Sequence, residues 1–141
     1  MRLKLVKEMK GREFVQKMEE QYDSLDKLQK LVEKYPGNYL YSLDLDDWMY
    51  FLEHPDDPVK QTDVLFVDKF KIGMSDLELL NTIKKEHPKS IRNLSHILNK
   101  DIKSVQPKVQ KLAESGLLKF EPGPKNAKKP VVNYDKIEIE I

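Results

Sequence analysis

Between Lys103 and Lys111 the chain carries side chains that can contact a phosphate group or the edge of a base. Six of these polar residues alternate with hydrophobic positions in a helical pattern: Lys103, Ser104, Gln106, Lys108, Gln110 and Lys111. A glutamine amide can pair with adenine through two hydrogen bonds, and a lysine ammonium can reach guanine or a phosphate. This segment therefore has the chemistry of a helix that contacts double-stranded DNA.

A second basic segment follows, within a flexible turn predicted over residues 122–129. Its candidate DNA contacts are Lys125, Asn126, Lys128 and Lys129. A loop of this length and charge can lie along the phosphate backbone or enter a minor groove. Three further residues complete the predicted interface: Ser90, Arg92 and Pro107. We expect Pro107 in the first turn of its helix, where a missing N–H is tolerated, with its ring towards a thymine methyl group.

The net charge of +1 hides a strong asymmetry along the chain. Residues 84–129 hold twelve Lys and Arg against four Asp and Glu, a net charge of +8, whereas residues 1–83 hold twelve against seventeen. A basic block beside an acidic one is typical of a nucleic-acid-binding module attached to a segment with another role. Lysine-rich faces are often only solvated, so charge alone does not identify a partner.

Other chemistry has little support in the sequence. There is no cysteine, which excludes disulfides, thiolate metal sites and thiol catalysis. His54, His87 and His96 are too scattered for a metal site. The acidic residues between 44 and 57 lack the glycine and terminal glutamate of a calcium loop, and no glycine-rich phosphate loop occurs. We therefore predict no enzymatic activity, no cofactor and no metal.

Three helices are predicted to position the basic residues. The first is capped by Ser75, with Glu78 three residues later, buries Leu77, Leu80 and Ile83, and ends at His87-Pro88. The second is capped by Ser90, and its predicted inner residues are Ile91, Leu94, Ile97 and Leu98.

Asn99-Lys100-Asp101 forms the turn to the third helix, since Asn tolerates a left-handed backbone. This helix begins near Ser104, buries Val105, Val109 and Leu112, and ends at Gly116. Strands are then predicted over residues 117–121, 131–134 and 135–141.

The N-terminal half has a less regular pattern. Residues 1–8 predict a strand with Leu3 and Leu5 on one side. An amphipathic helix with an apolar stripe from Phe14 to Tyr35 follows, interrupted near Asp23-Ser24, where Ser24 can cap a second segment. We expect strands over residues 38–41 and 64–67, a short helix from about Asp44, and a loop over residues 55–63. The aromatic residues from Tyr39 to Phe51 are interpreted as the core of this half, with a pocket or a partner surface as the alternative.

The order helix, helix, turn, helix, strand, basic loop, strand is that of a winged helix-turn-helix. The segment Leu-x-x-Ile-Leu-Asn-Lys-Asp, followed by Ser-Val-x-x-x-Val-x-x-Leu-x-x-x-Gly-Leu-Leu, resembles winged-helix regulators of the MarR/ArsR-like superfamily. The closing segment, residues 132–141, resembles the C-terminal end of a group of archaeal DNA-binding proteins. The resemblance covers residues 74–141, and loosely residues 42–52. Two departures are Pro107, where that group has a polar or basic residue, and residues 55–73, which look like an insertion.

The sequence thus predicts an α+β protein with a winged helix-turn-helix at residues 74–141 and an α/β extension at residues 1–73. The predicted function is sequence-specific binding of double-stranded DNA by a homodimeric transcriptional regulator. The Phe14–Tyr35 stripe either forms the dimer interface or packs on the winged domain. The alternative is an antitoxin-like interaction module that binds a protein partner through residues 12–57. The short apolar runs and the absence of a signal peptide predict a cytoplasmic protein without a membrane span.

Overall fold

Strand β1 (Arg2–Lys10) begins the chain with alternating buried and exposed side chains. Leu3 and Leu5 are buried, as predicted, but the strand continues two residues beyond the predicted end. The structure is a computed structural model, and it describes residues 1–66 and 71–141. Within these residues the chain forms an α+β protein with six α-helices and five β-strands.

The chain divides into two compact units, which are described separately. One comprises Lys7–Gln61, and the other comprises Met1–Val6 together with Thr62–Ile141. The predicted division between residues 73 and 74 does not coincide with this one. The reason is that the first residues of β1 pair with the last strand of the chain, which no local sequence pattern reveals.

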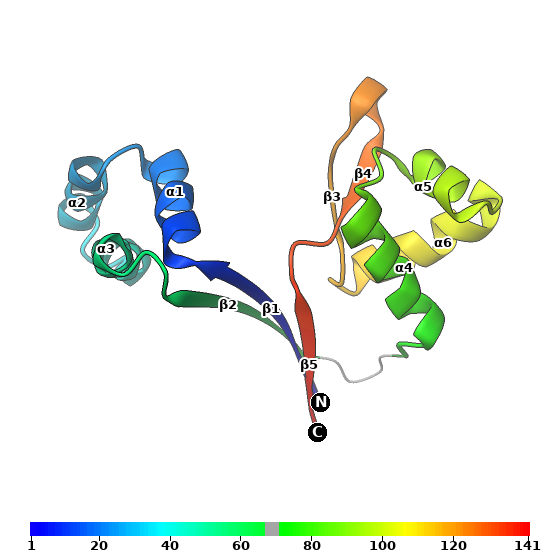
Figure 1. Cartoon of the computed structure of the whole chain (residues 1–141), viewed down its shortest axis with the longest axis horizontal. Helices are drawn as coiled ribbons and strands as arrows, with labels where there is room; N and C mark the ends of the chain where they lie inside the picture. Colours follow the sequence, from blue (N-terminus) through cyan, green and yellow to red (C-terminus); the bar gives the residue numbers. More distant parts are fainter. Residues whose placement is uncertain (67–70) are drawn as a thin grey trace. The chain divides into compact units, whose positions relative to one another are not determined.

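The unit Lys7–Gln61 contains three helices, α1 (Gly11–Tyr22), α2 (Leu25–Lys34) and α3 (Tyr39–Glu53) (Figure 1). Ser24 separates the first two, and its Oγ accepts a hydrogen bond of 3.2 Å from the Lys27 N–H, which confirms the predicted cap. The three helices enclose a core of buried residues: Met9, Phe14, Met18, Leu28, Leu45, Trp48 and Val59.

This core bears on two expectations, of which it corrects the first. Residues 39–41 are the start of helix α3 and not a strand, because the Asn38 side chain accepts a hydrogen bond from the Leu40 N–H and caps the helix. The Phe14–Tyr35 stripe contributes to packing within its own unit. Its buried members lie in the core of their own unit, covered by α3.

Strand β2 (Pro58–Phe66) occupies most of the segment that was predicted to be a loop. It lies beside β1 in a three-stranded sheet of order β2-β1-β5. A strand is stabilised by the partner that accepts and donates its hydrogen bonds, and here the partner is about fifty residues earlier in the chain. The predicted strand over residues 64–67 is thus part of β2, except that Val67 lies outside the described residues.

The second unit contains α4 (Met74–Glu86), α5 (Ile91–Leu98) and α6 (Ile102–Glu114), followed by the hairpin β3 (Lys119–Pro122) and β4 (Lys128–Val131). A short 3-10 turn, Pro124–Asn126, joins the two hairpin strands. The core of this unit combines residues from all three helices with residues from strands and the segments beside them: Leu5, Leu79, Leu80, Ile83, Leu94, Val105, Val109, Leu112, Leu117, Leu118 and Val132. Leu77 and Ile97, predicted to be inside, are exposed.

The helix ends follow local signals, with two corrections. α4 starts at Met74, one residue before the predicted cap, and the Gly73 N–H donates to the Asp76 carboxylate over 2.9 Å. α6 begins two residues earlier than predicted, because the Asp101 side chain accepts from the Lys103 N–H.

The remaining signals are confirmed. Ser90 caps α5 by accepting from the Asn93 N–H over 2.9 Å. Asn99, with φ of 52°, has the left-handed backbone expected in the turn. Gly116, with φ of 85°, ends α6, and the Leu117 N–H there donates to the Leu112 carbonyl over 3.0 Å.

Strand β5 (Lys136–Glu140) pairs antiparallel with β1. Leu3 lies opposite Ile139 and Leu5 opposite Ile137, so these apolar side chains share one face. The end of the pair carries charge, because Glu140 bonds Arg2 at 2.6 Å and Lys4 at 2.5 Å. These two cations lower the pKa of Glu140, the hydrogen bond from Lys4 having the largest effect.

Of the helices in the described residues, none combines the length and apolar character needed to cross a bilayer.

Candidate nucleic-acid interface

Helix α6 has one buried face and one exposed polar face. Val105, Val109 and Leu112 are buried at 2%, 0% and 2% exposure. All six polar residues predicted to contact DNA on this helix are exposed: Lys103, Ser104, Gln106, Lys108, Gln110 and Lys111. No acidic residue occurs between Ile102 and Ala113, so over these positions the exposed side chains of α6 are cationic, amide and hydroxyl groups apart from Pro107. Glu114, the last residue of the helix, is acidic and exposed.

Pro107 lies inside α6 and not in its first turn, as was predicted. The difference follows from the earlier start of the helix at Ile102. Because proline has no N–H, the Lys103 carbonyl, four residues earlier, receives no helical hydrogen bond from position 107. The ring is exposed, so this part of the polar face has an apolar interruption.

The exposed residues of α6 do not all face the same way. Ser104 and Lys108 line a hollow of about 170 Å³ together with Glu78, Leu79 and other residues of α4. A second set of residues lies on the side of α6 opposite the buried stripe. Its members follow one another at about one helical turn: Lys103, Pro107, and then Gln110 and Lys111. We call this set the outer line of α6, and it is the part of the helix that a ligand facing α6 meets first.

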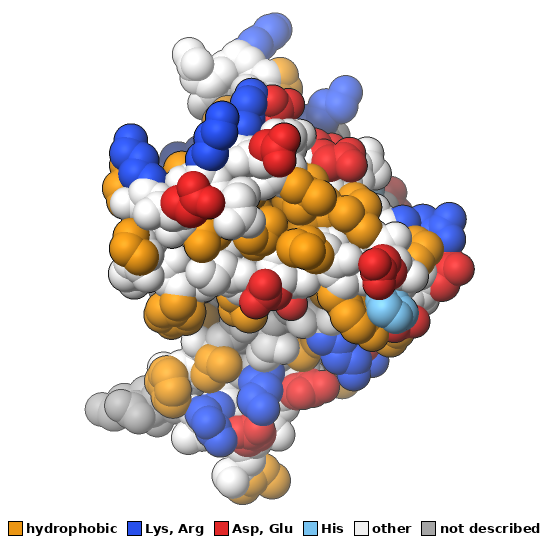
Figure 2. All heavy atoms as spheres, turned by 90° about the vertical axis from the view of Figure 1, so that its left-hand side faces the viewer, with side chains coloured by type: hydrophobic (Ala, Val, Ile, Leu, Met, Phe, Trp, Pro, Cys, Tyr) orange, Lys and Arg blue, Asp and Glu red, His pale blue; other side chains and the backbone are white. Residues whose placement is uncertain are grey.

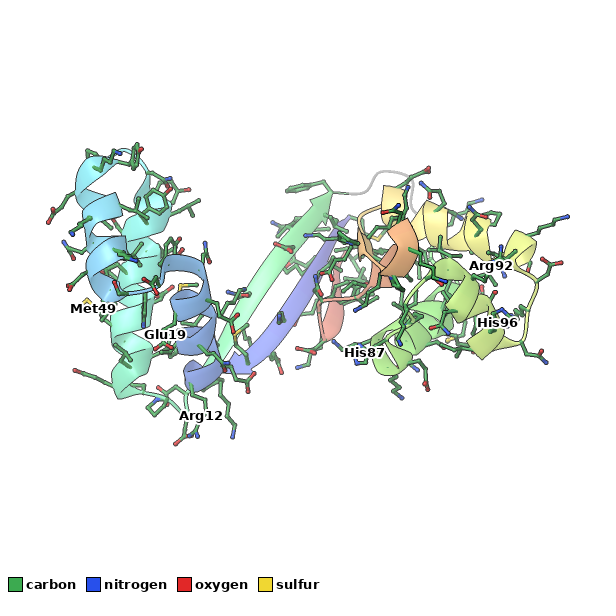
Figure 3. The ribbon with its side chains drawn as sticks, turned by 90° about the horizontal axis from the view of Figure 1, so that it is seen from above. Arg12, Glu19, Met49, His87, Arg92 and His96 are labelled. Atoms are coloured by element: carbon green, nitrogen blue, oxygen red, sulfur yellow. The ribbon has the colours of Figure 1, made fainter. Side chains whose placement is uncertain are left out.

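A second hollow, of about 420 Å³, lies at α5 and the turn to α6. Its lining includes three basic side chains, Arg92, His96 and Lys100, of which only Arg92 was in the predicted set. Arg92 and His96 are one helical turn apart and project from α5 (Figure 3). The spacing of four residues between Arg92 and His96 places both on one side of α5, so the sequence could have predicted that they lie together. Lys100 lies beside them because of the left-handed turn at Asn99, which the spacing alone does not indicate.

Ser90, also in the predicted set, has a structural role. Its hydroxyl accepts the Asn93 N–H, and the Lys89 N–H donates to the Asn93 side chain over 3.0 Å. These bonds hold the start of α5 in place. Arg92 follows in the first turn of the helix, and its side chain is exposed.

The hairpin places its basic residues differently from the prediction. Lys128 and Lys129 belong to strand β4, opposite Pro122 and Glu121, and only Lys125 and Asn126 lie in the connecting turn. Both turn residues have positive φ, 55° and 63°. The Lys128 ammonium lies 5.5 Å from the centre of the Phe120 ring, which is within the range of a cation–π contact.

Gly123 brings the hairpin close to the segment before α5. A Cβ at this position would lie 2.6 Å from the Lys89 carbonyl oxygen and 3.0 Å from the Ala127 carbonyl oxygen. The Gly123 N–H also donates to the Ala127 carbonyl over 2.7 Å. The absence of a side chain therefore allows the turn to approach the backbone that leads into α5.

The described parts of the chain contain no set of side chains suited to bind a metal ion. Within residues 1–66 and 71–141 no three His, Cys, Asp or Glu side chains are grouped so that they could hold an ion. Most polar groups at α5, α6 and the hairpin are cations, amides and hydroxyls, which bind anions and polar edges, and the carboxylates of Asp101 and Glu121 lie among them.

Comparison with known proteins finds a match to the model of a protein family. The sequence model of a family described as HVO_A0114 matches residues 74–139, from the start of α4 into β5. No curated protein matches the chain, and no solved structure matches it.

Proposed function

We propose that residues 74–141 form a winged helix-turn-helix that binds double-stranded DNA, with α6 as the recognition helix and the β3–β4 hairpin as the wing. The observation that carries this proposal is the exposed face of α6, which is free of acidic residues over twelve positions, Ile102 to Ala113. A solvated helix surface does not need this bias, whereas a polyanionic ligand does.

The dimensions of α6 fit a major groove. Its thirteen residues give a length of roughly 20 Å at 1.5 Å per residue, and the groove, about 12 Å wide, admits one helix. In the proposed complex the outer line of α6 faces the base edges. Gln110 pairs with adenine, while Lys103 and Lys111 reach guanine or phosphates.

The remaining basic groups supply phosphate contacts on both sides of α6. Arg92, His96 and Lys100 surround the hollow at α5, and Lys125 and Lys128 extend from the hairpin. Contacts of this kind hold a protein on the duplex without reading sequence. The twelve Lys and Arg against four Asp and Glu in residues 84–129 agree with such a role.

We further propose that the protein acts on transcription as a homodimer, since helix-turn-helix proteins commonly read two half-sites through a two-fold axis. The buried residues of the Phe14–Tyr35 stripe are occupied within one unit, so a dimer would use another surface. Light scattering at micromolar concentration tests the dimer, and a monomeric mass would remove this part of the proposal.

Binding itself is tested with labelled genomic fragments at low salt. We expect selection of bound fragments followed by sequencing to return a shared motif. The charge reversal Lys111→Glu should abolish binding, whereas Lys30→Glu, an exposed position on α2 with the same change in charge, should leave most of it. Absence of binding at low salt, or equal loss in the two variants, would contradict the DNA proposal.

A further inference from the structure

Helix α3 has a face that its own unit leaves uncovered. Leu45 and Trp48 on its inner side are buried, at 8% and 3% exposure. On the opposite side Tyr39, Leu43 and Tyr50 are exposed at 74%, 50% and 49%. A helix that is apolar on both sides is normally covered on both sides.

We call this surface the outer face of α3 and define it by residues that share one side of the helix: Tyr39, Leu40, Leu43, Asp46, Asp47 and Tyr50. Figure 2, seen from the side on which Figure 1 places α2, shows hydrophobic side chains gathered on the surface with carboxylates among them. Contiguous exposed apolar groups that include tyrosines are typical of surfaces that bind another protein.

The charge around this face has a single sign. Residues 35–59 contain six Asp and Glu and no Lys or Arg. Three of the six have partners, since Asp44 accepts from the Tyr22 hydroxyl, Asp56 pairs with Arg12 and Asp57 accepts from the Tyr50 hydroxyl. In the described part of the chain no such bond is found for Asp46, Asp47 or Glu53.

The carboxylates at the centre of the face repel one another. Partial burial raises the pKa of Asp47, and the charges of Asp44 and Asp46 raise it further. Packing this face against the same face of a second copy would bring two such clusters together, which like-charge repulsion opposes. A cationic surface would relieve the repulsion, so the charges favour a basic partner over a second copy.

We propose that the outer face of α3 is the docking surface for a basic amphipathic helix of another protein. The apolar side of that helix covers Tyr39, Leu43 and Tyr50, and its Lys or Arg side chains lie against Asp46 and Asp47. The exposed line from Tyr39 to Tyr50 spans twelve residues, and its eleven steps of 1.5 Å give roughly 17 Å of helix. A partner helix of about three turns therefore matches it.

A defined probe tests the chemistry without knowledge of the partner. The probe is a fluorescent synthetic peptide of about 18 residues, with Leu and Lys spaced so that they occupy opposite sides of a helix. The matched control peptide has Glu in place of every Lys. We expect saturable binding of the Leu–Lys peptide to the full chain, measured by anisotropy without DNA, and no binding of the Leu–Glu peptide. If neither peptide binds, or both bind equally, the proposal is overturned.

Paired variants locate the binding. Asp46→Asn with Asp47→Asn should weaken the Leu–Lys peptide by about tenfold. Glu19→Gln with Glu20→Gln on α1 has the same effect on net charge and should leave the affinity unchanged (Glu19 is labelled in Figure 3). Leu43→Ser should weaken binding comparably, whereas Met74→Ser, at a position 70% exposed, should not.

Two results would overturn the assignment to this face. One is an equal loss of peptide affinity in the α3 and α1 charge variants, because the peptide would then respond only to overall charge. The other comes from sedimentation of the chain alone. A dimer that Leu43→Ser converts to a monomer would mean that a second copy occupies the face. DNA binding is not involved in any of these measurements, so they are independent of the proposed function.

Discussion

The Tyr134 hydroxyl donates a hydrogen bond of 2.6 Å to the backbone carbonyl of Leu117. Leu117 has 0% exposure and follows the glycine that ends α6. The bond therefore ties the segment between β4 and β5 to the end of the proposed recognition helix. Burial raises the pKa of Tyr134 to about 12.

We expect the burial of Tyr134 to make the free energy of unfolding depend on pH in the alkaline range. An unfolded tyrosine has a pKa of about 10, so the folded state holds the proton more tightly. The stabilisation is fully present below pH 10 and is lost as the pH rises from about 10 to about 12. Tyr134→Phe should cost about 1 kcal/mol at neutral pH and should reduce the loss of stability over that alkaline range.

Urea unfolding of the wild type and of Tyr134→Phe at several pH values from 8 to 11.5 measures this difference. Tyr39→Phe is the matched control, because Tyr39 is 74% exposed and should behave as the wild type. Tyr22 adds a slope of the same sign to both proteins, since burial and its bond to Asp44 raise its pKa. An alkaline slope unchanged in Tyr134→Phe would contradict the assignment.

A methyl group at Gly11 should destabilise the unit Lys7–Gln61. The new Cβ would lie 2.4 Å from the His54 carbonyl oxygen and 2.9 Å from the Phe51 ring, so the backbone must move. We expect Gly11→Ala to cost about 1–3 kcal/mol. Trp48 is the only tryptophan and lies in this unit, so its fluorescence reports the unfolding. Gly37→Ala, where no atom lies within 4 Å, should be close to neutral.

A side chain at Gly123 should displace the β3–β4 hairpin from the segment that leads into α5. In Gly123→Ala the new Cβ would meet the Lys89 carbonyl oxygen at 2.6 Å, and the turn would be pushed away from α5. If the hairpin acts as a wing, DNA affinity falls several-fold while α6 is unchanged. Gly73→Ala is the control, since its nearest atom, an Asp76 carboxylate oxygen, is 3.9 Å away. Unchanged affinity in a folded Gly123→Ala would argue against a wing that contacts DNA.

The salt dependence of DNA affinity should distinguish residues that contact phosphates from residues that contact bases. Lys125→Gln removes one phosphate contact, and the slope of log affinity against log salt should fall by about one. Gln110→Ala removes a base contact, so it should relax the sequence preference and leave the slope unchanged. Anisotropy over a salt series with the selected site and a scrambled site measures both quantities. A change in the salt slope of Gln110→Ala would mean that Gln110 contacts the phosphate backbone and not a base.

Local signals were sufficient for most helix ends. Ser24, Ser90, Asn99 and Gly116 act through hydrogen bonds and backbone angles within a few residues, so the sequence alone predicts them correctly. The buried stripe of α6 was predicted for the same reason, because Val105, Val109 and Leu112 repeat at helical spacing. The exposed polar residues of α6 follow from that stripe.

The errors lie where a distant partner decides the structure. Helix α3 was partly predicted as a strand because apolar residues on both of its sides hide the helical period. Residues 58–66 were predicted mainly as a loop, but β1 supplies the strand beside them. Ile97 has the spacing of a core residue, yet it is 41% exposed because the elements around α5 cover it only in part.

Sequence by itself thus determined most helix ends and the composition of the basic face, since both depend on near neighbours. Tertiary structure decided which exposed residues lie together. Lys100 joins Arg92 and His96 around one hollow, and Ser104 and Lys108 turn towards α4. It also left the outer face of α3 exposed, whereas it buried Phe14, Met18 and Leu28 of the Phe14–Tyr35 stripe. Burial depends on which elements pack against each other, and that packing joins residues too far apart in the chain for any local pattern to reveal.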